Sequence, residues 1–113
     1  MASAALRIEG LPESPLDASA YFHAKVLPEI CAAYEGQKDI DLIIVFDPAG
    51  HEHRAWRLAV VQELAREVAP ARVNAMASDD EGAIAAARAY LEAAKGVTGQ
   101  LLALDGNGAG SVL

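Results

Sequence analysis

The chain has 113 residues, of which 53% are apolar and only 5% aromatic, and its net charge is −7. This length suits one domain over residues 1–113, with a single core built from Ala, Leu, Val and Ile. The negative charge without any Lys or Arg cluster argues against nucleic acid and membranes as partners, and the lack of a signal-peptide pattern or a bilayer-spanning apolar run favours the cytoplasm.

The first elements expected are a strand and a helix. Residues 4–10 are short and partly alternating, which is typical of a strand at the edge of a sheet. A helix then runs from a cap at Asp17 or Ser19 to about Tyr34, and Gly36 ends it.

Two residues inside this first helix carry specific expectations. Pro28 removes one main-chain hydrogen bond and its ring crowds the carbonyl four residues earlier, which predicts a kink near Ala24. Cys31 is the only cysteine, so an intrachain disulfide and a Cys-based metal site are both excluded. Its place on a helix predicts a buried thiol.

The middle of the chain has the strongest pattern. A continuous apolar run bounded by Asp41 and Asp47 predicts a central strand over residues 40–47, covered on both faces. Residues 52–69 repeat apolar positions three and four apart until Pro70, which predicts a helix. A second strand over residues 72–77 completes a parallel crossover, for which the right-handed form is expected.

The last third of the chain predicts one more helix and strand. Ser78 to Glu81 resembles a capping box before an alanine-rich helix that extends to Lys95. A turn and a final strand follow within residues 97–105, and residues 106–113 are expected to be a flexible tail. Together the elements predict a three-layer α/β sandwich with a truncated, Rossmann-like parallel sheet of about four strands and three helices.

Two segments carry a family resemblance. Residues 63–75 read ELAREVAPARVNA and residues 98–106 read TGQLLALDG, and both resemble segments of the short-chain dehydrogenase/reductase (SDR) family in the expected order. Residues 26–29, VLPE, are similar to the helix before the family's fifth strand. The resemblance covers about residues 5–110 and implies the second half of an SDR-like Rossmann fold.

The resemblance also implies where catalytic groups belong. The family binds a dinucleotide through a Gly-rich turn that the residues before Leu6 do not supply, and it uses Ser, Tyr and Lys in catalysis. Here the Tyr position falls on Gly50, the Lys position on Arg54 and the Ser position near Asp47. We therefore assign no catalytic, cofactor-binding or metal residue, expect no cofactor, and expect a pseudoenzyme without dinucleotide-dependent reductase activity.

An alternative is a small metal-binding protein or enzyme. His51 and His53 follow the central strand closely, and Asp47 ends it. Imidazole and carboxylate groups together suit zinc or a similar ion. The simpler interpretation is a polar helix N-terminus whose acidic residue Glu52 complements the helix dipole.

Apolar positions around the two central helices predict self-association. They cover more than the stripe needed for docking on a sheet, which favours a two-fold dimer and a function in interaction. A full-length SDR, to which the chain would be an accessory subunit, is the competing partner, and a monomer is the third possibility. The predicted interface residues are Phe22, Val26, Ile30, Trp56, Val60, Val61 and Leu64.

Overall fold

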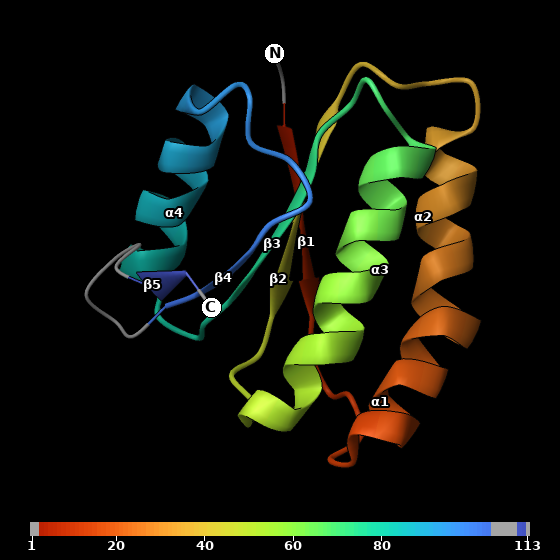
Figure 1. The fold of residues 1–113 in the computed structure, drawn as a ribbon, viewed down its shortest axis with the longest axis vertical. Helices are drawn as coiled ribbons and strands as arrows, with labels where there is room; N and C mark the ends of the chain where they lie inside the picture. Colours follow the sequence, from red (N-terminus) through yellow and green to blue (C-terminus); the bar gives the residue numbers. More distant parts are fainter. Residues whose placement is uncertain (1–2, 105–110, 113) are drawn as a thin grey trace.

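One sheet of four parallel strands and a short antiparallel strand forms the centre of the computed structural model, which describes residues 3–104 and 111–112. Strand order follows the chain, as Figure 1 shows. The strands are β1 (Ser3–Ile8), β2 (Asp41–Phe46), β3 (Val73–Ala77), β4 (Leu101–Ala103) and β5 (Ser111–Val112). The predicted four-stranded parallel sheet is confirmed. Of the expected tail, residues 106–110 and 113 lie outside the described residues, and Ser111–Val112 form β5.

Strand β2 is the central strand that the apolar run predicts. All six of its residues are buried, and it pairs in parallel with β1 on one side and β3 on the other. Ile44, for example, lies opposite Leu6 of β1 and Ala75 of β3. Strand β1 has β2 as its only neighbour among the described strands, which agrees with the predicted edge position.

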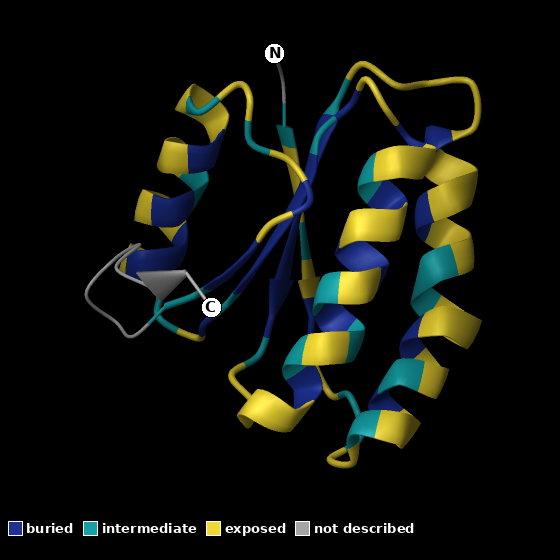
Figure 2. Cartoon of the chain, in the orientation of Figure 1, coloured by how far each residue is buried: buried dark blue, intermediate teal, exposed yellow. Residues whose placement is uncertain are grey.

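Helices cover both faces of the sheet. On one face lie α1 (Pro15–Tyr21), the π-helical turn η1 (Phe22–Val26) and α2 (Leu27–Tyr34), which continue into one another, and beside them α3 (Arg54–Glu67). Helix α4 (Glu81–Ala93) covers the other face. Figure 2 shows buried residues where these helices turn toward the sheet. None of the helices within residues 3–104 has the length and apolar character needed to cross a bilayer.

Alternate residues of β2 pack into two separate hydrophobic cores, one on each face of the sheet. Leu42, Ile44 and Phe46 pack with α2 and α3, while Ile43 and Val45 pack with α4. This alternation follows from the period of two along a strand. The three-layer α/β sandwich is therefore confirmed.

The crossover through α4 has the opposite hand to the two before it. The strands advance in one direction from β1 to β4, yet α4 lies on the face opposite to α3. Parallel crossovers are right-handed in about 98% of cases. A sheet that contains both hands therefore holds one rare connection, which periodicity and composition do not reveal.

The first helix differs from its prediction at its start. Ser14, rather than Asp17 or Ser19, is the N-cap, and its hydroxyl accepts a hydrogen bond from the main-chain N–H of Asp17 at 3.1 Å. Pro15 follows at the first helical position, where a missing N–H costs nothing because that group has no partner within the helix.

The irregularity expected from Pro28 takes the form of a π-helical turn. Leu27 donates its N–H to the carbonyl of Phe22, five residues earlier, and the π-helix spans the predicted position at Ala24. A π turn widens the helix locally and so accommodates a residue that cannot donate a main-chain hydrogen bond.

Cys31 occupies different surroundings from those expected, and most of the predicted interface residues belong to the core of the single chain. The Cys31 side chain is exposed, so the predicted buried thiol is wrong: it lies one position, or about 100° around the helix, beyond the buried Ile30. Five of the seven predicted interface residues are buried within this single chain. They are Phe22, Ile30, Val60, Val61 and Leu64, whereas Val26 and Trp56 are half-buried.

The helix α4 also begins differently from the predicted capping box. Asp80 is its N-cap and accepts a hydrogen bond from Gly82 N–H at 3.0 Å, while Ser78 accepts one from Asp80 N–H at 3.0 Å. The carboxylate of Asp80 lies nearer to the free amides of the first turn than Ser78 does, so it displaces the serine as cap. The helix ends at Ala93, two residues before Lys95.

A buried ion pair closes the amino end of the sheet. The carboxylate of Asp41, which is 3% exposed, accepts hydrogen bonds from Arg72 N–H at 2.8 Å and from Arg72 Nε at 2.9 Å. Arg72 Nη2 lies 2.8 Å from Asp41 Oδ2, and Arg72 Nη1 donates to the carbonyls of Leu91 and Ala94 in and after α4. The pair thereby joins β2, β3 and α4.

Candidate functional site

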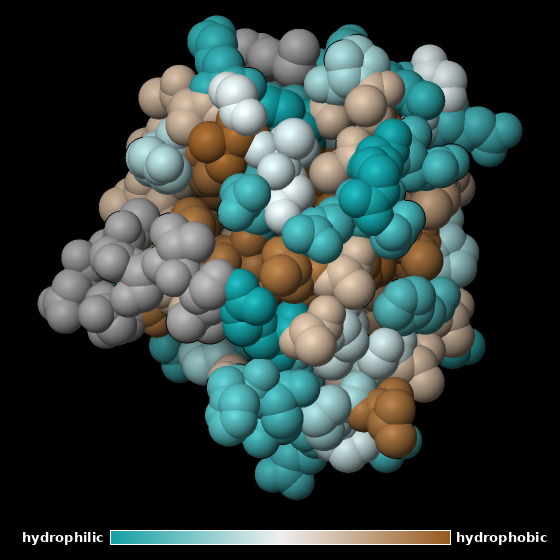
Figure 3. All heavy atoms as spheres, in the orientation of Figure 1, coloured by the Kyte–Doolittle hydropathy of each residue, from teal (hydrophilic) through white to brown (hydrophobic). Residues whose placement is uncertain are grey.

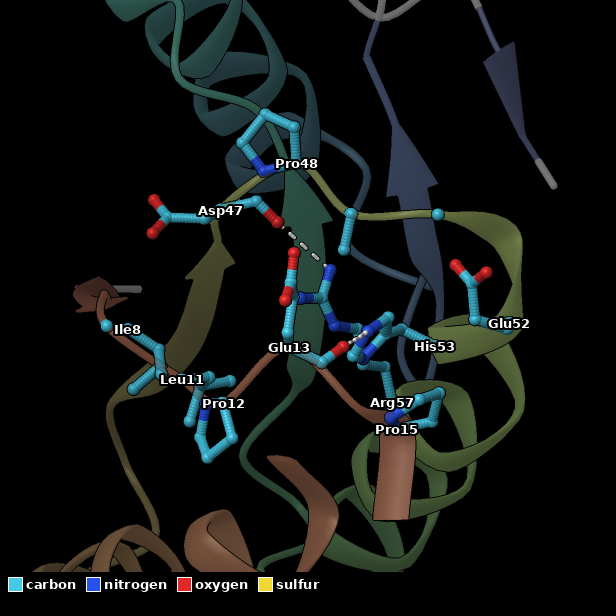
Figure 4. A pocket seen from close by; sticks show the side chains of 13 residues that line it. Ile8, Leu11, Pro12, Glu13, Pro15, Asp47, Pro48, Glu52, His53 and Arg57 are labelled. Carbon is cyan, nitrogen blue, oxygen red and sulfur yellow. Dashed lines mark hydrogen bonds between the residues drawn. The ribbon is translucent and has the colours of Figure 1, made fainter. Parts of the chain in front are cut away.

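A cavity of about 550 Å³ opens at the carboxyl ends of β1 and β2. It lies between the loop after β1 and the loop that leads from β2 into the short 3₁₀ helix η2 (His51–His53), and Figure 4 shows its lining. In parallel sheets this edge is where ligands bind. The lining residues are Ile8, Gly10, Leu11, Pro12, Glu13, Pro15, Asp47, Pro48, Ala49, Gly50, Glu52, His53 and Arg57.

His53 holds the two loops of the cavity together. Its imidazole is buried, its Nε2 lies 2.9 Å from the carbonyl oxygen of Glu13, and its Nδ1 accepts a hydrogen bond from Trp56 Nε1 at 3.2 Å. A carbonyl only accepts and an indole only donates, so this geometry fixes the neutral tautomer with the proton on Nε2. Both ring nitrogens are occupied, and His53 acts as a structural link between η2 and the loop before α1.

Arg57 lies on the first turn of α3 and is 5% exposed. Its Nη1 donates to the main-chain oxygen of Asp47 at 3.1 Å, and its guanidinium carbon lies 4.4 Å from the centre of the Phe46 ring. Burial lowers the pKa of the Arg57 guanidinium, and the negative charge of Asp47 offsets part of this effect. Figure 4 shows this guanidinium among the lining residues of the cavity.

The residues of the alternative metal site do not come together. His51 is exposed, His53 uses both ring nitrogens for hydrogen bonds, and the carboxylate of Asp47 points away from His53 in Figure 4. Within residues 3–104 and 111–112, the structure gathers no group of three or more His, Cys, Asp or Glu side chains suited to a metal ion. The arrangement favours the interpretation of this segment as a polar helix start.

The positions that the family resemblance assigns to Tyr and Lys lie beside the cavity. Gly50 precedes η2, and a β-carbon built on it would lie 1.7 Å from the carboxylate oxygen Oε1 of Glu52, which folds over this glycine. Arg54 begins α3 and is half-buried. The resemblance therefore places the two positions at the carboxyl edge of the sheet, but Gly50 offers no phenol and Arg54 offers a planar guanidinium in place of the lysine's amine.

The three tyrosines of the chain lie elsewhere. Tyr34 donates its hydroxyl to the carbonyl of Ile40 at 2.6 Å, at the opposite, amino end of β2. Burial, followed by the charge of Asp41, raises the pKa of Tyr34. Tyr21 and Tyr90 are exposed on helices. None of the three lines the cavity.

A second hollow of about 450 Å³ runs along the outside of the helices η1, α2 and α3. Its apolar lining includes Leu27, Val60 and Leu64 and the exposed residues Cys31 and Ala59, and its polar lining consists of Ser19, His23, Glu63 and Glu67. Figure 3 shows apolar side chains interspersed with hydrophilic ones over the face of the molecule in view. We call this hollow the helix groove.

Sequence reasoning did not identify Arg57 as a site residue, although a signal was present. Arg57 lies four residues before Val61 and seven before Leu64, so it shares the buried stripe of the helix with them. A charged residue on such a stripe is rarely fully buried unless it has a specific partner. The spacing within the helix therefore indicates, from the sequence alone, that Arg57 has a special role.

Comparison with known proteins supports the resemblance. The sequence matches the family "SDR-like: Short chain dehydrogenase-like protein" over residues 6–104. No match to the chain was found among curated proteins or among solved structures. The match covers most of the chain, including all four parallel strands apart from the first three residues of β1. The chain belongs to the short chain dehydrogenase-like family.

Proposed function

We propose that this chain is a non-catalytic, SDR-like Rossmann-type domain that works through association with a second copy of itself. It carries out no reduction with NAD or NADP. The observation on which the proposal rests is the composition of the cavity at the carboxyl edge of the sheet.

The cavity lining contains none of the residue types that the family uses in catalysis. Among the described residues that line it, there is no Ser, Tyr or Lys. Hydride transfer to a carbonyl needs an acid that protonates the developing alkoxide, and the family supplies a phenol whose pKa a neighbouring lysine lowers. Gly50 and Arg54 stand at those two positions, and they supply neither the acid nor a matching amine.

The first test is nucleotide binding. We expect isothermal titration of the 113-residue chain with NAD⁺, NADH, NADP⁺ and NADPH to give no saturable heat up to about 1 mM, the limit at which binding contributes only about 4 kcal/mol. A complete short-chain dehydrogenase titrated in the same buffer is the positive control. A micromolar dissociation constant for any of the four nucleotides contradicts the proposal.

The helix groove is the surface that supports self-association. It combines an apolar lining with exposed residues on two neighbouring helices, and a two-fold axis through such a surface brings α2 and α3 against their copies. Val60 and Val61 are already core residues of the single chain, so the interface we propose uses the exposed neighbours Cys31 and Ala59 together with the half-buried Trp56.

The second test is the molar mass of wild type and a groove variant. We expect light scattering at micromolar concentration to give about twice the 11.8 kDa of one chain, and Ala59→Arg to give a mass near 11.8 kDa because a charge enters the apolar contact. Ala86→Arg, at an exposed alanine of α4, is the matched control and should keep the doubled mass.

The choice of position makes this test decisive. A glutamate at Val60 or Val61 would be placed inside the core of each chain and would unfold it, so a lost dimer would have no meaning there. A wild-type mass near 11.8 kDa contradicts self-association directly. If the doubled mass persists in Ala59→Arg and falls in Ala86→Arg, the interface lies on the opposite face of the molecule, at α4.

A further inference from the structure

Arg57 is a buried cation, and most of its N–H donors have no hydrogen-bond acceptor among the described residues. Its only hydrogen bond to the described residues runs from Nη1 to the carbonyl of Asp47, and its Nε is buried without a partner. It forms no ion pair with any carboxylate of the described chain. The guanidinium lines the cavity at the carboxyl edge of the sheet.

The unused atoms have a specific geometry. Nε is enclosed by the protein, whereas Nη2 forms no hydrogen bond to the described residues and is not among the enclosed atoms, so its N–H groups are the donors open to the oxygens of a carboxylate. The contact with the Phe46 ring and the bond to Asp47 hold the plane in place. A buried charge of this kind is costly unless it is paired, so the site is arranged for an anionic group from outside the chain.

The remaining lining restricts which anion fits. Three acidic residues, Glu13, Asp47 and Glu52, also line the cavity, and both ring nitrogens of His53 are already used in hydrogen bonds. Apart from Arg57, the lining therefore repels a ligand that is only negative. An ammonium group on the ligand offsets this repulsion. It can pair with the carboxylates of the lining while the ligand's own carboxylate, a few bonds away, binds Arg57.

We propose that this cavity binds a small zwitterion of the amino-acid class, with its carboxylate on Arg57 and its ammonium toward the acidic residues of the lining. The volume of about 550 Å³ lies in the range of small-molecule sites. Ile8, Leu11 and Pro48 add apolar surface for the ligand's side chain. The site does not depend on self-association, since all its residues come from one chain.

The first experiment identifies the ligand class. Thermal unfolding is measured with each of the twenty common amino acids at about 10 mM, where a ligand that binds the folded state raises the midpoint by mass action. The amino acid with the largest shift is then titrated calorimetrically beside its deaminated acid and its decarboxylated amine. We expect both analogues to bind about tenfold more weakly or worse, since each lacks one charge.

Variants of Arg57 test the assignment of the residue. Arg57→Met keeps an apolar chain over Phe46 and should abolish the midpoint shift, whereas Arg57→Lys keeps the charge without the planar guanidinium and should weaken binding by about tenfold. Arg66→Met is the control: Arg66 is exposed and pairs with Glu63 outside the cavity, so this variant should bind as the wild type does.

Three results overturn the proposal. The first is that no amino acid of the panel shifts the unfolding midpoint of the wild type. The second is that Arg57→Lys and a folded Arg57→Met bind the selected amino acid as tightly as the wild type. The third is that the deaminated acid or the decarboxylated amine binds as tightly as the amino acid itself.

Discussion

Replacing Asp41 by alanine is expected to lower the free energy of unfolding by about 3–5 kcal/mol, the cost of removing one member of a buried ion pair. The carboxylate of Asp41 accepts hydrogen bonds from the main chain and the side chain of Arg72 and is almost fully buried. Without it, the Arg72 guanidinium, whose side chain is only 15% exposed, keeps its charge with only carbonyl partners.

Urea denaturation followed by circular dichroism measures this loss. Asp39→Ala changes an exposed carboxylate two residues away and should alter stability by no more than about 0.5 kcal/mol. The double variant Asp41→Leu with Arg72→Met should recover much of the loss, because apolar residues of similar size remove both charges together. A loss below about 1 kcal/mol for Asp41→Ala contradicts a structural role for the pair.

Phe22→Ala is expected to lower the free energy of unfolding by a similar amount, about 3–5 kcal/mol, because it leaves a cavity in the larger core. The Phe22 ring is fully buried, and its centre lies 5.8 Å from that of Phe46 and 5.6 Å from that of Trp56. The three rings form the aromatic contact between η1, β2 and α3, so the loss affects the docking of both helices on the sheet.

Fluorescence of Trp56, the only tryptophan, follows unfolding of this variant in urea. Tyr21→Ala is the matched control, since Tyr21 precedes Phe22 on the same helix but is 48% exposed, and its removal should cost less than about 1 kcal/mol. Phe22→Leu should fall between the two. Equal losses for Phe22→Ala and Tyr21→Ala would contradict the assignment of Phe22 to the core.

The central strand and its helix were predictable because their patterns are local. The five residues of β2 after Asp41 are an unbroken apolar run, which a strand covered on both faces requires, and the structure buries all of them. Helix α3 repeats buried positions three and four apart and ends before Pro70. These patterns depend on neighbours in the sequence, so no long-range information was needed.

The π-helical turn had a signal that sequence reasoning left unused. Ala18, Phe22, Val26, Ile30 and Tyr34 are each four residues apart, and four of them are buried while Val26 is half-buried. An α-helix turns about 400° in four residues, so a row of this spacing drifts by about 40° at each step. The π turn has more residues per turn, so each residue turns through a smaller angle about the helix axis. This offsets the drift and keeps the row facing the sheet.

The contacts that build the candidate site and the ion pair could not be predicted in this way. Arg72 lies 31 residues after Asp41, and His53 lies 40 residues after Glu13. The sequence alone does not identify such distant partners, because this requires knowing which strands are neighbours in the sheet. The hand of the crossover through α4 is equally invisible, since it depends on which face of the sheet receives the helix.

That crossover has a consequence for the carboxyl edge of the sheet. Strands β2 and β3 are neighbours, yet the chain leaves β2 toward the face covered by α3 and leaves β3 toward the face covered by α4. Loops that diverge to opposite faces from adjacent parallel strands leave a gap between them, and such gaps usually arise where strand order reverses. Here the order never reverses among β1 to β4, so the change of hand alone sends the segments that follow Phe46 and Ala77 to opposite faces of the sheet.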